Sequence, residues 1–165
     1  MLENLFDLVK QNADAAIINN AAIPNERNDE AVETASSSIF DGLRNAVASG
    51  NLNDVIGMFS GHSDTASNPV TQNIQGGFIQ QLMHKFGLDH NAADGIAGGL
   101  IPNVLKKLIH KTNDPNDNSF DLSSILGKLG VGNLDLKNIL GKFTGNGNTQ
   151  GGGGILDSLK GMLGK

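Results

Sequence analysis

The sequence contains no cysteine, tryptophan or tyrosine, and its seven aromatic residues are all phenylalanine. Without cysteine, the chain has no disulfide, thiolate metal ligand or cysteine nucleophile. No apolar run approaches the roughly 20 residues that a membrane span needs, and the first residues, with an acid at Glu3, lack the basic segment of a secretory signal. We therefore expect a soluble cytoplasmic protein with a core of Leu, Ile, Val, Met, Ala and Phe.

Positive charge is scarce in the first part of the chain. Residues 1–64 contain ten acids and three bases, a net charge of −7, whereas residues 65–165 contain seven acids and nine bases, a net charge of +2. Together they give the net charge of −5 for the whole chain. An acidic chain is a poor default binder of nucleic acid or of anionic membranes. Such binding is therefore expected only where the second part gathers its lysines.

Apolar residues recur at helical spacing, and no stretch alternates with period two over a useful length. Asn28, Asn68 and Asp89 are predicted to cap helices, and Gly50 and Gly87 to end them. The fold class expected is all-α, a compact multihelical bundle of short helices. Helices are predicted over residues 2–19, 28–48, 69–86, 90–101 and 102–111, with Pro102 either kinking the chain or beginning a new helix.

A short motif recurs in the chain: "DLSSILGKL" at 121–129, "DLKNILGKF" at 135–143, "NLNDVIGMF" at 51–59, and the truncated "SLKGMLGK" at 158–165. Each copy is a cap residue followed by a two-turn amphipathic helix with one narrow apolar stripe. The stripes of the three complete copies are Leu122, Ile125, Leu126 and Leu129; Leu136, Ile139, Leu140 and Phe143; and Leu52, Val55, Ile56 and Phe59.

Helices this short are not stable alone in water, so each copy must dock on something. The stripes either fill the protein's own core or accept a second helix, which gives self-association or capture of a protein partner. The Gly-rich stretch 144–154 is predicted to be a tether that frees a C-terminal amphipathic helix, 155–165, for docking or for weak contact with a membrane surface. The interacting residues predicted on that helix are Ile155, Leu159, Met162 and Leu163.

The segment "KFGLDHNAADGIAGGLIPNVLKKL" at 85–108, with the later "NDPND" and "LGKLG", resembles the YidB-like family of bacterial proteins of unknown function. The resemblance covers roughly residues 69–130. It implies a compact bundle of short helices, partly similar to homeodomain arrangements, and no known activity or catalytic residues. We divide the chain into an acidic helical region at 1–60, a YidB-like core at 68–143, the tether and the C-terminal helix.

The stretch "KTNDPNDNSFDLSS" at 111–124 places side-chain oxygens at Asp114, Asn116 and Asn118, as a calcium-binding loop does. Such a loop needs Gly at its sixth position and Glu at its twelfth, where this chain has Ser119 and Ile125. A turn followed by a helix that Asp121 caps, with Phe120 packing on Ile125, explains more of the residues.

Other candidate chemistry is weak. His90 and Asp94 are four residues apart, but a zinc site needs three or four ligands. Ser36, Ser37 and Ser38 lack the context of a serine nucleophile. We therefore expect no enzyme activity, metal or cofactor.

The function predicted is helix association, with the chain itself as a homo-oligomer or with another protein. The alternative is a homeodomain-like module that binds nucleic acid. It would use a basic patch made of Lys85, Lys106, Lys107, His110 and Lys111. The acidic total and the few side chains suited to base readout argue against it.

Overall fold

The computed structural model describes residues 2–131, which belong to one compact unit. The all-α prediction is confirmed for this part of the chain, which contains no strand. The tether at 144–154 and the helix at 155–165 lie outside the described residues. The α-helices are α1 (Leu2–Asn12), α2 (Asn28–Ala48), α3 (Leu52–Phe59), α4 (Pro69–Phe86), α5 (His90–Asn113) and α6 (Leu122–Leu126), and shorter helical turns are η1 (Asp14–Ile18), η2 (Asn25–Arg27) and η3 (Gly127–Val131).

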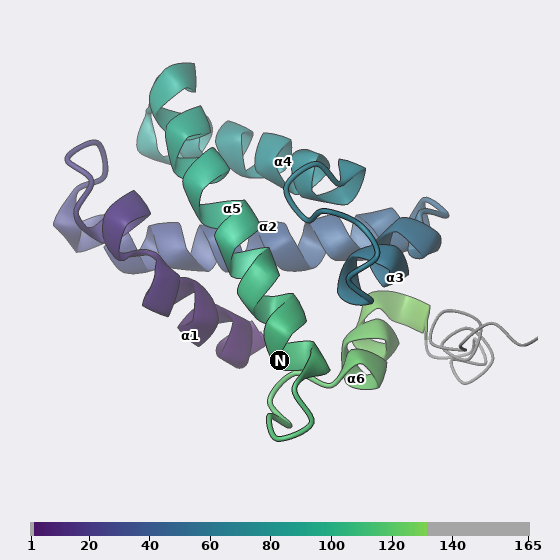
Figure 1. Ribbon diagram of the computed structural model, residues 1–165. Coiled ribbons are helices and arrows are strands. Elements are labelled where there is room, and N and C mark those ends of the chain that lie inside the picture. The colour runs from purple at the N-terminus through teal and green to yellow at the C-terminus, as the bar shows by residue number, and fades with distance from the viewer. Residues whose placement is uncertain (1, 132–165) are drawn as a thin grey trace, which may run out of the picture. The chain divides into compact units, whose positions relative to one another are not determined.

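Four helices form the body of this unit. The helix α2 packs against α1 and α4, and α5 packs against the same two helices. In the view of Figure 1, α5 crosses in front of α2, with α1 on one side of the crossing and α4 on the other. All four helices contribute to the core, which includes the fully buried side chains of Leu5, Ile39, Phe78 and Leu100.

The predicted ends of α4 are confirmed. Asn68 accepts a hydrogen bond from the backbone N–H of Val70 at 2.8 Å, so its side chain caps the helix just before Pro69. At the other end Gly87 adopts a left-handed conformation with φ of 66°. Asp89 then caps α5 by accepting from the backbone N–H of Ala92 at 2.7 Å. These signals are local, which is why the sequence alone reveals them.

One other prediction about helix ends needs correction, and the structure decides between the two alternatives at Pro102. Asn28 does not cap α2 but is its first residue, and Arg27 before it forms a two-pronged ion pair with Glu30 at 2.8 and 3.0 Å. Pro102 begins no new helix, since α5 runs through it to Asn113. A proline inside a helix removes one backbone hydrogen bond, and here the buried residues on both sides of it, such as Ile101 and Val104, hold the helix in the core.

The contact between α2 and α4 is close and polar. Gln81 donates to the hydroxyl of Ser38 at 3.2 Å, and Lys85 donates to the hydroxyl of Thr34 at 3.4 Å, so the two helices run antiparallel. Further along, a methyl group added at Gly42 would lie 3.3 Å from Cβ of Ile74 and would overlap its Cγ1. The glycine therefore permits the helices to approach here.

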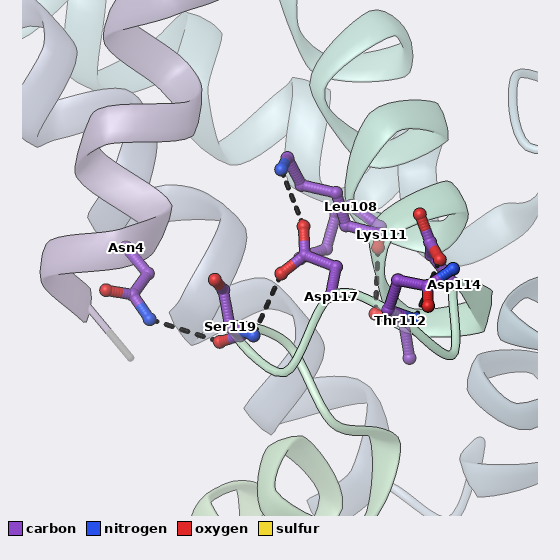
Figure 2. A network of polar contacts seen from close by, with 8 residues as sticks. Asn4, Leu108, Lys111, Thr112, Asp114, Asp117 and Ser119 are labelled. Atoms are coloured by element: carbon purple, nitrogen blue, oxygen red, sulfur yellow. Dashed lines mark hydrogen bonds and ion pairs between the residues drawn. The ribbon is translucent and has the colours of Figure 1, made fainter.

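The helices of the predicted acidic region at 1–60 pack against helices of the residues that follow. The helix α1 packs against both α2 and α5, and the described residues from both predicted regions fall within one unit. Figure 2 shows Asn4 of α1 beside the loop after α5, where its amide donates to the backbone carbonyl of Ser119 at 3.1 Å. The first helix is thus an integral part of the bundle.

Candidate functional site

A groove of about 360 Å³ lies between the first turns of α1 and the middle of α2. Its volume falls in the range of roughly 300–1,000 Å³ that is usual for ligand clefts, and the half-exposed side chain of Leu2 contributes to it. Its lining residues are Leu2, Glu3, Phe6, Asp7, Glu33, Ser36 and Ser37.

The apolar part of the groove comes from α1. The sequence predicts Leu2, Leu5, Phe6 and Val9 on one buried face, and the structure buries Leu5 and Val9 but leaves Leu2 50% exposed and Phe6 partly exposed. Leu8 is buried together with Leu5 and Val9. The buried face of α1 is therefore rotated away from Leu2 and Phe6, and these two apolar side chains face the groove.

The wall from α2 is polar and small. The hydroxyl of Ser36 donates to the backbone carbonyl of Val32 at 2.8 Å, one turn earlier in the helix. Ser38, on another side of α2, bonds to the carbonyl of Thr34 in the same way. Hydroxyls engaged like this are not prepared to act as nucleophiles, which need an adjacent base. The wall thus offers space and small polar side chains to the groove.

The charge around the groove is negative. Glu3, Asp7 and Glu33 line it, and within residues 2–131 none of these three forms an ion pair. The nearby Lys10 pairs with Asp29 at 3.0 Å and lies 5.7 Å from the centre of the Phe6 ring. The groove can therefore bury apolar side chains while its rim attracts positive charge.

Acids in the first turns of a helix interact favourably with its dipole, and that role alone would explain Asp29, Glu30 and Glu33 from the sequence. The structure gives them separate partners: Asp29 pairs with Lys10 and Glu30 with Arg27, whereas Glu33 lines the groove. The side-chain bonds from Arg27 lower the pKa of Glu30. The sequence does contain one indication of the groove. In α1, Leu2 and Phe6 are each followed directly by an acid, so apolar and acidic side chains lie close together.

The predicted interacting residues of the first repeat copy lie inside the protein. Ile125, Leu126 and Leu129 are buried, and only Leu122 is partly exposed. Their stripe packs on the protein's own helices, so it is not available to a partner in this structure. The other predicted residues lie outside the described part of the chain: Leu136, Ile139, Leu140, Phe143, Ile155, Leu159, Met162 and Leu163.

The structure divides the predicted basic patch. Lys85, at the end of α4, reaches Thr34 on α2. Lys106 is 16 residues from the start of α5 at His90, which is about 24 Å of helix. Lys111 forms an ion pair with Asp117 at 2.8 Å. Only Lys106, Lys107 and His110 remain together as an exposed group on α5, a small footprint for nucleic-acid binding.

The turn predicted after α5 is confirmed. Asp114 accepts from the backbone N–H of Asn116, Asp117 accepts from that of Ser119, and Asp121 caps α6 by accepting from Ser124. Figure 2 shows the first two of these carboxylates turned toward their own loop, with Lys111 beside Asp117. The bond from Lys111 is the main reason that the pKa of Asp117 falls to about 2, and the Ser119 N–H adds to it.

Comparisons with protein-family models, with curated proteins and with solved structures find no match to this chain. In the part of the chain that the structure describes, no three His, Asp or Glu side chains are grouped as metal ligands would be. Among the described helices, none is both long and apolar enough to cross a membrane.

Proposed function

We propose that this protein is a non-enzymatic helix-association module that assembles with itself through short amphipathic helices. The proposal rests on the burial of the repeated motif in the structure. Both copies within the described residues bury their stripes against other helices, with Val55, Ile56 and Phe59 buried in α3 and Ile125 and Leu126 in α6. A two-turn helix needs such support to be stable.

The same motif is present at 135–143 and, truncated, at 158–165. If each copy requires a helical surface, these two copies also require one, and a second molecule of the chain can supply it. The hydrogen bonds that occupy the hydroxyls of Ser36 and Ser38 support a role in binding over a role in catalysis. The resemblance of residues 69–130 to the YidB-like family of bacterial proteins is compatible with this proposal and suggests no activity.

Light scattering after size-exclusion chromatography tests the proposal. The full chain and a truncation after Thr144 are compared from low to high micromolar concentration. We expect the mass of the full chain to rise above its 17.2 kDa monomer, while the truncated chain stays monomeric. A full chain that stays monomeric throughout would refute self-association.

A further inference from the structure

We propose that the groove between α1 and α2 receives the C-terminal segment 155–165 of a second copy of this chain. This inference rests on the proposed self-association and identifies the surface that accepts the helix. Its basis is the match between the groove, which the structure shows, and the apolar and charged residues of the segment.

The apolar parts match in kind and in scale. The segment has Ile155, Leu159 and Met162 at positions i, i+4 and i+7, followed by Leu163, which is one stripe on a short helix. The groove offers Leu2, half exposed, and the partly exposed ring of Phe6, around a space of about 360 Å³. Laying the apolar stripe of an amphipathic helix into such a groove is a common mode of peptide recognition.

The charges match in sign. Three acids, Glu3, Asp7 and Glu33, line the groove. The segment carries two lysines, Lys160 and Lys165, against one acid, Asp157. Charges of opposite sign at the rim of an interface steer the encounter and fix the orientation of the partner. The groove therefore favours this segment over an acidic helix of the same hydrophobicity.

The position of the segment in the chain also suits exchange between copies. The Gly-rich stretch 144–154 separates it from the preceding repeat copy at 135–143. From its composition this stretch is predicted to act as a tether, which would allow the segment to reach a site on another copy. If two copies exchange their segments, both grooves are filled in one symmetric dimer, and no second kind of site is needed.

Disulfide trapping tests the proposal directly, because the chain contains no cysteine of its own. A full chain with Ser37→Cys in the groove is mixed with a full chain with Ser158→Cys in the segment, in a glutathione redox buffer. The control mixture replaces the first variant by Gly98→Cys, which lies on the exposed face of α5 with open space around it. Peptide mapping then identifies the mixed disulfide, which forms only between two chains.

We expect the mixed disulfide to form at least about tenfold faster with Ser37→Cys than with Gly98→Cys, because docking raises the effective concentration of the two thiols. Equal rates, together with a mass that rises with concentration, would overturn the groove assignment and leave self-association intact. Equal rates with a constant monomer mass would overturn both. A chain carrying both substitutions that closes its disulfide internally, while the mixture does not cross-link, would overturn the assignment to a second copy.

Discussion

The two sides of α2 differ sharply. On the side toward α4, Thr34 and Ser38 are 1% and 5% exposed, and their hydroxyls accept hydrogen bonds from Lys85 and Gln81. On the side toward α1, Glu33 and Ser37 line an open groove. Small polar residues occur on both sides, so residue type alone does not distinguish a closed interface from an open one.

This difference predicts which substitutions in α2 change the stability of the fold and which change association. Added atoms or charge have no room on the closed side, so substitutions there should cost folding free energy. The open side can change without loss of the fold, and an effect there should appear in association. Substitutions on both sides of α2 therefore test whether the two sides differ in this way.

The largest effect is expected from a charge placed in the closed interface. Ser38→Asp puts a carboxylate beside Gln81, with no cation bonded at this position, and should lower the free energy of unfolding by roughly 3 kcal/mol. The adjacent Ser37→Asp faces the groove and should change it by less than about 0.5 kcal/mol. Urea denaturation of both variants checks this contrast, and equal losses would contradict it.

The next largest effect is expected from Gly42→Ala. Its added methyl group overlaps Ile74 across the interface, and overpacking of this kind costs roughly 1–3 kcal/mol. Combining it with Ile74→Ala, which removes the overlapping Cγ1 atom, should cost less than the sum of the two single losses, because the two residues are in contact. A double variant whose loss in urea denaturation equals the sum of the single losses would show that the contact is not the cause.

Gly98→Ala is the matched change at an open position and should have the opposite sign. A methyl group at Gly98 meets nothing within 4 Å, so the variant gains helix propensity without strain. We expect the free energy of unfolding to rise by about 0.8–1 kcal/mol. A lower thermal midpoint than that of the parent chain would mean that this face of α5 is covered.

The smallest effect is expected from Asp117. This residue lies in the loop that contacts α1 through the hydrogen bond from Asn4 to the carbonyl of Ser119. Lys111 and the Ser119 N–H hold the pKa of Asp117 at about 2, below the roughly 3.9 of an unfolded chain. A lowered pKa contributes stability that is fully present above pH 4 or so and disappears as the pH falls toward 2. The stability gap between the parent and Asp117→Asn should therefore narrow over this range.

Denaturation midpoints of the parent and Asp117→Asn at pH 7, 4 and 3 measure that gap. A gap at pH 3 as wide as the gap at pH 7 would show that the ionised carboxylate is not what stabilises the loop. Asn116→Ala is a suitable control, because its side chain takes no part in the bond to Lys111 and its backbone N–H, which does bond to Asp114, is retained.

Features that depend on neighbouring residues in the sequence could be predicted, and features that depend on how helices cross could not. Asn68, Pro69 and Gly87 define the ends of α4 by their own backbone chemistry. Asn28 looks like a cap in the sequence, but the ion pair from Arg27 to Glu30 occupies that turn. The sequence gives no warning of this, because Asn28 and Arg27 are both compatible with a helix start.

The groove depends on the rotation of α1. The spacing of Leu2, Leu5 and Val9 predicts a common buried face, but the angle at which α1 meets α2 decides how much of that face is covered. The residues of the predicted basic patch are divided for a related reason. Lys85 and Lys106 belong to consecutive helices, yet the length of α5 separates them.

Whether the groove between α1 and α2 mediates assembly can be decided from the mass of the full-length Phe6→Glu variant in solution. Met83→Glu is the matched control, since Met83 is 39% exposed on α4 and does not line the groove. We predict that the parent and Met83→Glu exceed 17.2 kDa at high micromolar concentration, whereas Phe6→Glu remains at the monomer mass. A Phe6→Glu chain that associates as the parent does would contradict the account.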